Sequence, residues 1–171
     1  MEMHGRQVTL RPLDPADAAR LAEILATREV ARWWTGYDQA RVEAEFFVAE
    51  PNVTVFGIEH AGALVGLLQV TEEPTPEFHF AAIDLFLDPG VHGRGLGPDA
   101  IRVVARHLIR HDGHHRLTID PAIDNEQAIR AYAKVGFKPV GRMREYQRFP
   151  DGTWRDALLM DLLADELEDG G

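Results

Sequence analysis

Three alternate glycines, at positions 93, 95 and 97, constrain the fold of this chain more than any other feature of its sequence. They belong to the run His92-Gly93-Arg94-Gly95-Leu96-Gly97, which separates a strand-like apolar segment at residues 83–87 from an amphipathic segment that begins at Pro98. A glycine-rich turn between a strand and a helix aims several backbone N–H groups, and the helix N-terminus, at one point. The run therefore predicts strand, turn and helix in that order, with a cradle for an anion such as a phosphate group.

The spacing of these glycines argues against two common nucleotide-binding loops. A dinucleotide fingerprint has the pattern Gly-x-Gly-x-x-Gly, but the sixth position counted from Gly93 is Pro98. A Walker loop ends in Gly-Lys-Ser/Thr, a tripeptide that the sequence lacks. Alternatively, the glycines at residues 92–97 only form a tight turn and bind no phosphate.

The composition is that of one soluble globular domain. The chain has 171 residues, 45% of them hydrophobic and 27% charged, which is enough to bury a core without disulfides or metals. The net charge of −10 argues against nucleic acid as a partner, because phosphate backbones require clustered Lys and Arg. The same acidic excess would attract a cationic small molecule, or it serves solubility alone.

Two residue types that carry nucleophilic chemistry are missing from the sequence. The chain contains no Cys and no Ser, which excludes a serine triad and a cysteine nucleophile. The lack of Cys also fits a reducing compartment. Neither a signal sequence nor an apolar run of membrane-spanning length is evident, so we expect a cytoplasmic protein with no membrane partner.

The order of the predicted elements is typical of an α/β domain. We expect strands at residues 8–10, 52–59, 63–71, 78–87, 114–120, 137–149 and 154–162, and helices at residues 15–26, 38–48, 125–135 and from 97 onward. This order predicts a mixed central sheet of about seven strands flanked by about four helices. Residues 1–164 would form a single domain, and the acidic residues 165–171 a flexible tail.

Two motifs together resemble the GNAT superfamily of N-acetyltransferases. The run from Val91 to Gly97 resembles the acyl-CoA pyrophosphate loop of that superfamily, with His92 where Gln or Arg is usual. The stretch from Asn125 to Phe137 has the pattern N-x-x-A-x-x-x-Y-x-K-x-G-F, which is similar to its last helix. The resemblance implies the GNAT fold, in which two central parallel strands splay apart to form the acyl-CoA cleft. Those strands are residues 78–87 and 114–120 here.

The resemblance also implies acetyl-CoA as the co-substrate, without a metal. Backbone groups in the strand before the glycine turn would bind the pantetheine arm, and one N–H near Phe86 would polarise the thioester carbonyl. The turn itself would bind the pyrophosphate. The expected cofactor-binding residues are Leu85, Phe86, Leu87, His92, Gly93, Arg94, Gly95, Leu96, Gly97, Asn125 and Tyr132.

Direct acetyl transfer to an amine needs help with two protons, one leaving the amine and one reaching the CoA sulfur. Tyr132 stands where the superfamily commonly has the acid, although a plain core tyrosine would fit the same helix face. Asp84 is the expected base, because a carboxylate in an apolar strand is costly without a role or a partner. A structural ion pair is its alternative, and Asp120 is a second candidate base.

A second resemblance narrows the substrate. The paired Trp33 and Trp34, the strand 83–86 and the stretch 118–121 resemble the aminoglycoside 6'-N-acetyltransferases. This resemblance implies transfer to the 6'-amine of a polycationic aminosugar antibiotic, and hence antibiotic resistance. Aromatic faces and an acidic field suit such a cation. The expected substrate-binding residues are Trp33, Trp34, Glu73, Asp84 and Asp120.

Several alternatives stay open in the sequence. The same fold serves siderophore hydroxylysine, ribosomal-protein N-termini and polyamines, and a non-catalytic CoA-binding module is also compatible. The two tryptophans would then only pack a loop over the core. The histidines at 107, 111, 114 and 115 lack an evident third ligand, so we expect a surface cluster and no metal. The chain would act as a monomer or a homodimer.

Overall fold

The computed structural model describes residues 1–168, which form eight strands and five α-helices. The strands are β1 (Met3–His4), β2 (Val8–Arg11), β3 (Val53–His60), β4 (Ala63–Glu73), β5 (Phe80–Leu87), β6 (Arg116–Ile119), β7 (Lys138–Arg148) and β8 (Trp154–Leu163). The helices are α1 (Asp17–Leu25), α2 (Arg28–Ala31), α3 (Gln39–Phe46), α4 (Leu96–Arg110) and α5 (Glu126–Val135).

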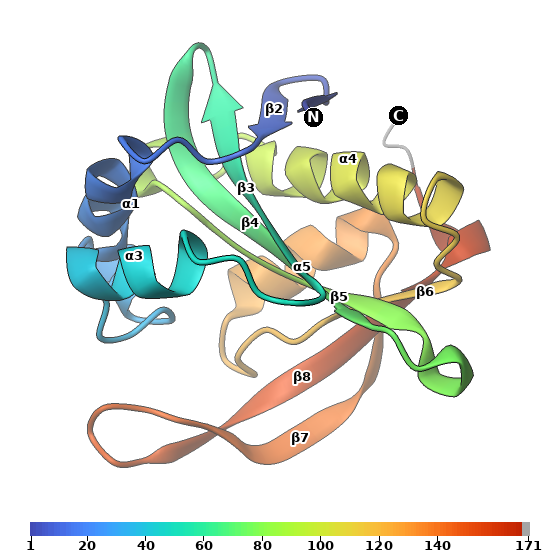
Figure 1. The fold of residues 1–171 in the computed structure, drawn as a ribbon. Coiled ribbons are helices and arrows are strands. Elements are labelled where there is room, and N and C mark those ends of the chain that lie inside the picture. Colours follow the sequence, from blue (N-terminus) through green and yellow to red (C-terminus); the bar gives the residue numbers. More distant parts are fainter. Residues whose placement is uncertain (169–171) are drawn as a thin grey trace.

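All eight strands form one mixed sheet in the order β1-β2-β3-β4-β5-β6-β8-β7 (Figure 1). The central β5 and β6 are parallel and pair at Ala81 with Leu117 and at Ala82 with Thr118. In the part of the chain that the structure describes, their pairing stops there, so the carboxyl halves of the two strands diverge. The predicted α/β fold with a splayed parallel pair is confirmed. The short β1 and α2, which the sequence pattern did not reveal, bring the counts to eight strands and five helices.

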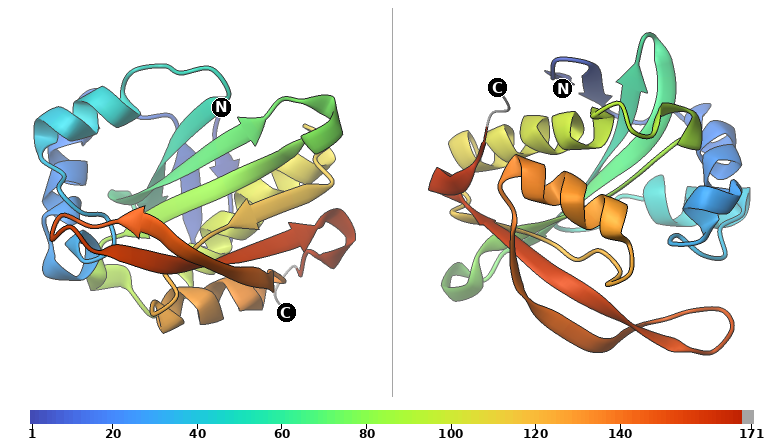
Figure 2. Two further views of the ribbon diagram at one scale, coloured as in Figure 1. Left: turned by 90° about the horizontal axis from the view of Figure 1, so that it is seen from below. Right: turned by 180° about the vertical axis from the view of Figure 1, so that it is seen from behind.

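The sheet has an apolar core on each face. Ile83 of β5 belongs to the cluster under α4 and α5, which contains the fully buried Ile101. Phe86 belongs to the other cluster, with Leu21 of α1 and Val42 of α3. Because side chains alternate along a strand, residues 83 and 86 point to opposite faces. Beyond the sheet, β7 and β8 continue as a two-stranded arm (Figure 2).

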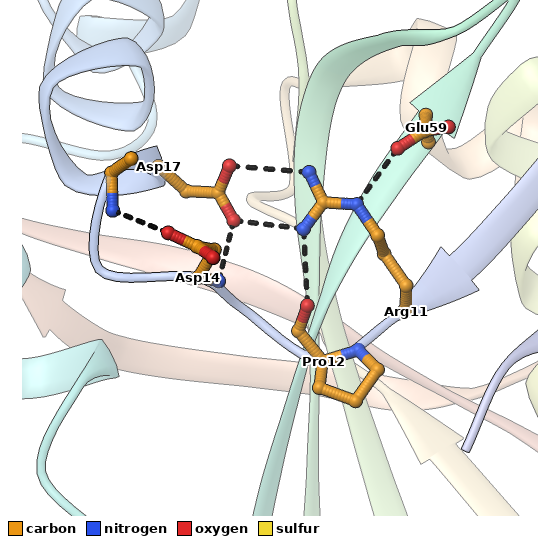
Figure 3. A network of polar contacts seen from close by, with 6 residues as sticks. Arg11, Pro12, Asp14, Asp17 and Glu59 are labelled. Carbon is orange, nitrogen blue, oxygen red and sulfur yellow. Dashed lines mark hydrogen bonds and ion pairs between the residues drawn. The ribbon is translucent and has the colours of Figure 1, made fainter.

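The first helix begins later than its sequence predicts. Asp14 and Pro15 form a turn, in which the Asp14 backbone oxygen accepts from the N–H of Asp17 at 2.8 Å. The helix starts at Asp17, whose carboxylate receives two hydrogen bonds from the Arg11 guanidinium, at 2.8 and 3.1 Å (Figure 3). Arg11 also donates to Glu59 at 2.7 Å. This bidentate pair therefore ties α1 to β2 and β3 and overrides the local proline signal.

Asp99, in the first turn of α4, holds the N-terminal segment against the sheet. Its side chain is only 5% exposed. One carboxylate oxygen accepts from the backbone N–H of Arg6 at 3.1 Å, and the other accepts from Gln7 at 2.7 Å and Val8 at 3.1 Å. These three hydrogen bonds join residues 6–8 to α4, a contact that no short sequence pattern indicates.

His114 corrects the expectation of a surface histidine cluster. It is 1% exposed, donates from Nε2 to Glu72 at 2.6 Å and stacks on His79 with ring centres 4.2 Å apart. The turn after α4 folds back, with the His114 N–H bonded to the Leu108 carbonyl, and this directs the ring inward. Among residues 1–168, no group of three potential ligands is placed to hold a metal ion.

The first residues of the predicted tail contact the domain. Glu166 pairs with Lys138, and the N–H of Glu168 donates to the carbonyl of Val135 at 3.0 Å. The rest of the predicted tail, residues 169–171, lies outside the described residues. Within residues 1–168, no helix has both the length and the apolar character needed to cross a membrane.

Candidate active site

A cavity of about 1230 Å³ opens where β5 and β6 part. Its walls come from the loop around Trp33, the end of β5, the glycine turn, α5 and the arm of β7. Pockets for a single small ligand usually measure about 300–1,000 Å³. This cavity is larger, and therefore has room for two molecules side by side.

Nearly all of the residues predicted for the site line this cavity. They are Trp33, Trp34, Asp84, Leu85, Phe86, Leu87, His92, Gly93, Gly95, Leu96, Gly97, Asp120, Asn125 and Tyr132. Arg94 does not line it, and its carbonyl accepts a hydrogen bond from the Gln7 side chain at 3.1 Å. Sequence positions from four distant segments are thus brought to one place by the divergence of the two central strands.

Glu73, which we expected to bind substrate, is the second exception, because it is not among the residues that line the cavity. It pairs with Phe80 at the start of β5, whereas Asp84 pairs with Gln69. Glu73 is four positions beyond Gln69, which places it roughly 13 Å farther along the strand, away from the cavity. Its carboxylate instead accepts from the N–H of Thr75 at 2.9 Å. The pairing of β4 with β5 continues to Glu73, two residues past the predicted end of this strand at residue 71.

The glycine turn forms an open cradle. Gly93 and Gly95 both have φ of +78°, and Gly95 caps α4. A Cβ at Gly93 would have no atom within 4 Å, so the space around it is free for a ligand. His92 donates from Nε2 to the Leu87 carbonyl at 2.8 Å. The imidazole thus braces the turn against β5, and the free N–H groups at the start of α4 suit a phosphate.

We expect Gly93→Ala to weaken acetyl-CoA binding about 5- to 30-fold, because the left-handed conformation costs other residues about 1–2 kcal/mol. Isothermal titration with CoA would measure this change. Gly152→Ala is the matched control. Gly152 has φ of +84° and equally open surroundings, but it lies outside the cavity. An unchanged affinity in the Gly93 variant would show that the turn does not carry the phosphate.

Two carboxylates flank the split in the sheet. Asp84 lies on β5 and Asp120 directly follows β6. Burial raises the pKa of Asp84 to about 6, and the nearby charge of Asp120 adds to the effect. Burial also raises the pKa of Asp120, while a hydrogen bond from the Tyr146 hydroxyl, 2.8 Å away, opposes that rise. The two acids are therefore electrostatically coupled, and Asp84 changes charge near neutral pH.

Tyr132, on α5, belongs to the same group. Burial raises its pKa well above the ordinary value, and the charges of Asp84 and Asp120 raise it further. A phenol in this setting keeps its proton at neutral pH and is available as a donor. The structure therefore brings together the acid and both candidate bases that the sequence indicated.

The two tryptophans have different surroundings. Trp34 packs edge-on against Phe86, with ring centres 5.1 Å apart, and borders the core under α1 and α3. Trp33 carries the Arg32 guanidinium 4.6 Å from its ring centre. Trp34 thus anchors the loop, while Trp33 offers a face that already accommodates a cation.

Sequence reasoning missed two tyrosines of the site. Tyr37 lies beneath the Arg41 guanidinium at 3.9 Å and donates to Glu45 at 2.6 Å. Tyr146 reaches the cavity from β7. Neither residue belongs to a motif. The aromatic Trp-Trp-Thr-Gly-Tyr run offered a weak signal for Tyr37, whereas nothing in the sequence pattern marked Tyr146.

Comparison with known proteins settles the family. Residues 7–138 match the family model described as an acetyltransferase (GNAT) domain. The chain belongs to the GNAT acetyltransferases. It is therefore an acetyl-CoA-dependent N-acetyltransferase, and acetyl-CoA is its co-substrate.

Relatives of this GNAT enzyme act on different amines. It is 31% identical to the N-alpha-acetyltransferase RimI of Mycobacterium tuberculosis, over 82% of this chain and 85% of that protein. It is 27% identical to an aminoglycoside N(6')-acetyltransferase type 1 of Klebsiella pneumoniae, over 85% and 79% of the two chains. The solved structure of AAC(6')-Ib with paromomycin and acetyl-CoA has a TM-score of 0.77 and 26% identity, covering 94% and 95%.

Proposed function

We propose that this enzyme transfers the acetyl group of acetyl-CoA to the 6'-amine of an aminoglycoside, and so confers antibiotic resistance. The observation that carries the proposal is a pair of interacting carboxylates, Asp84 and Asp120, in a cavity that Trp33 also lines. Paired negative charges suit a substrate with several ammonium groups, and an aromatic face suits a sugar ring or a cation. The net charge of −10 favours the approach of such a polycation.

In this proposal the cradle and β5 hold the co-substrate, which supplies the acetyl thioester. The backbone N–H groups from Gly93 to Gly97 bind its pyrophosphate. Backbone groups of Leu85 and Leu87 bind its pantetheine arm, although the Leu87 carbonyl already accepts a hydrogen bond from His92. A backbone N–H near Phe86 polarises the thioester carbonyl.

Asp84 and Tyr132 move the two protons. Asp84 takes a proton from the substrate ammonium, so that the nitrogen lone pair attacks the acetyl carbon as the carbon–sulfur bond breaks. Tyr132 gives its hydroxyl proton to the CoA sulfur. The acylated nitrogen then loses its second proton, which restores the Tyr132 hydroxyl, and the proton on Asp84 passes to solvent. The ammonium groups of bound substrate offset the negative charges of Asp84 and Asp120. Because those two charges raise the pKa of Tyr132, offsetting them makes its proton easier to transfer. Each assisted proton transfer is worth about 10²–10⁴-fold in rate.

A matched pair of antibiotics tests the substrate. Neomycin carries an amine at the 6' position, where paromomycin carries a hydroxyl. We expect rapid release of CoA thiol with neomycin and little with paromomycin, measured with a thiol-reactive dye that meets no protein Cys. Equal rates with both antibiotics would mean that the acetylated amine is not the one at the 6' position.

A protein N-terminus is the second candidate substrate, because a RimI enzyme is among the relatives. A peptide amine, a polyamine and a lysine-type amine therefore complete the panel. Turnover with one of these, and none with any aminoglycoside, would overturn the proposed substrate while keeping the family activity.

A further inference from the structure

The distal part of β7 carries a bulge that the proposed chemistry does not yet use. On one side of it Met143 pairs with Ala157, and on the other Gln147 pairs with Arg155. Residues 144–146 therefore face the single residue Asp156. Two extra residues in one strand bend that strand and re-aim its side chains, and such bulges are frequent beside active sites.

The bulge is held in a costly conformation. Glu145 has φ of +49°, in the left-handed region that is unfavourable for a residue with a side chain. Asp156 stabilises it by accepting from the Glu145 N–H at 2.8 Å and from Arg142 Nε at 2.5 Å. The Asp156 carboxylate therefore stabilises the unfavourable backbone conformation of Glu145.

The same part of β8 also holds the segment that follows β6. The Ile123 N–H donates to the Asp156 carbonyl at 3.0 Å, and the Leu158 N–H donates to the Pro121 carbonyl at 2.9 Å. Asp120 therefore lies on one side of β8 and the bulge on the other. The bulge turns the next side chain, Tyr146, across to Asp120, where its hydroxyl donates at 2.8 Å.

We propose that Tyr146 is a positioning residue of the amine site, whose hydroxyl, aimed by the bulge of β7, holds the Asp120 carboxyl group directed into the cavity. The inference rests on the proposed function for the identity of the amine. Tyr146 does not itself move a proton of the reaction. It fixes the second negative charge of the site, so that a cation is held beside Asp84.

The surroundings of Asp120 determine what removal of this hydroxyl does. Asp120 faces Asp84 from β5, Tyr132 from α5 and Tyr146 from β7. On β8, Asp156 and Asp161 are already bonded to Arg142 and Arg116. The Tyr146 hydroxyl is the larger of two donors that oppose the effect of burial on Asp120, the other being the backbone N–H of Asp120 itself, and loss of the hydroxyl raises the pKa of that carboxyl.

Tyr146→Phe tests the inference by kinetics. We expect the KM for the amine to rise about 3- to 10-fold at pH 7 and the KM for acetyl-CoA to stay unchanged. The acid limb of kcat/KM for the amine should move to higher pH, since both carboxylates must be ionised to hold a cation. In an Asp120→Asn background the same substitution should have no further effect. A purely structural role would not produce this dependence.

Two further variants separate the bulge from the stability of the arm. Glu145→Pro cannot adopt the positive φ and lacks the N–H that Asp156 accepts, so it should reproduce the kinetics of Tyr146→Phe. Glu145→Gly should leave them as in the wild type. Trp154→Phe, at an exposed position of the same arm outside the cavity, is the control for general perturbation.

An NMR titration of the carboxyl carbons measures the protonation of Asp120 without any turnover. The Asp120 signal is the one that disappears in Asp120→Asn. We expect the Asp120 midpoint to move to higher pH in Tyr146→Phe. An unchanged midpoint would overturn the inference, whatever amine is acetylated. A shifted midpoint in an enzyme that acetylates no aminoglycoside would support the inference and overturn the proposed substrate.

Discussion

Asp84→Asn is expected to lower kcat about 10²–10⁴-fold and to leave the affinity for acetyl-CoA unchanged. An amide has the shape of the carboxyl group but cannot take a proton from the ammonium group of the substrate. Asp84 lies on β5 beside the split, while the cradle for the phosphates lies beyond the end of that strand. Steady-state kinetics with the best amine, together with a CoA titration, would separate the two effects.

The pH profile sharpens this test. Because burial raises the pKa of Asp84 to about 6, the base loses its charge as the pH falls through that value. Wild-type activity should therefore increase with pH through about 6, and this limb should disappear in Asp84→Asn. Asp84→Glu keeps a carboxylate and should recover part of the rate. If the asparagine variant retained a third or more of kcat, Asp84 would not be the base.

Asp99→Asn is expected to lower the free energy of unfolding by about 3 kcal/mol, which is a large share of a typical domain stability. The buried carboxylate accepts from three backbone N–H groups in residues 6–8. An amide keeps one oxygen and turns an NH2 group toward at least one of these donors. Urea unfolding followed by circular dichroism would measure the change.

Asp112→Asn is the matched control for this prediction. Asp112 follows the C-terminal end of the same helix, is 40% exposed and lies 3.6 Å from His107 Nε2. The same chemical change there should alter the free energy of unfolding by less than about 0.5 kcal/mol. Equal effects of the two substitutions would contradict the clamp at Asp99.

Signals that act over a few residues could be predicted from the sequence. The helix expected from residue 97 onward begins at Leu96, and Asn125 caps α5 with its side chain accepting from the Ala128 N–H at 3.2 Å. Gly136 ends that helix with φ of +118°. Each of these depends on local backbone geometry, which residue type controls directly. These local signals allowed the glycine turn and the helix that carries Tyr132 to be placed from the sequence.

Features that depend on distant partners were missed or misplaced. The Asp14-Pro15 signal lost to the Arg11–Asp17 pair, which forms only once β2 and α1 are packed. Glu73 was assigned to the site for its negative charge, whereas pairing with β5 places it beside Phe80, and it does not line the cavity. The bulge that brings Tyr146 to Asp120 likewise depends on the register of β7 against β8.

The product of the reaction tests the central claim most directly. We would incubate the enzyme with neomycin and acetyl-CoA labelled in the acetyl carbonyl, and locate the label in the product by NMR. A single labelled amide on the 6' nitrogen is the predicted result. Labelled acetate with unmodified neomycin would contradict the account, because an enzyme that only hydrolyses the thioester has no amine site between Asp84 and Asp120.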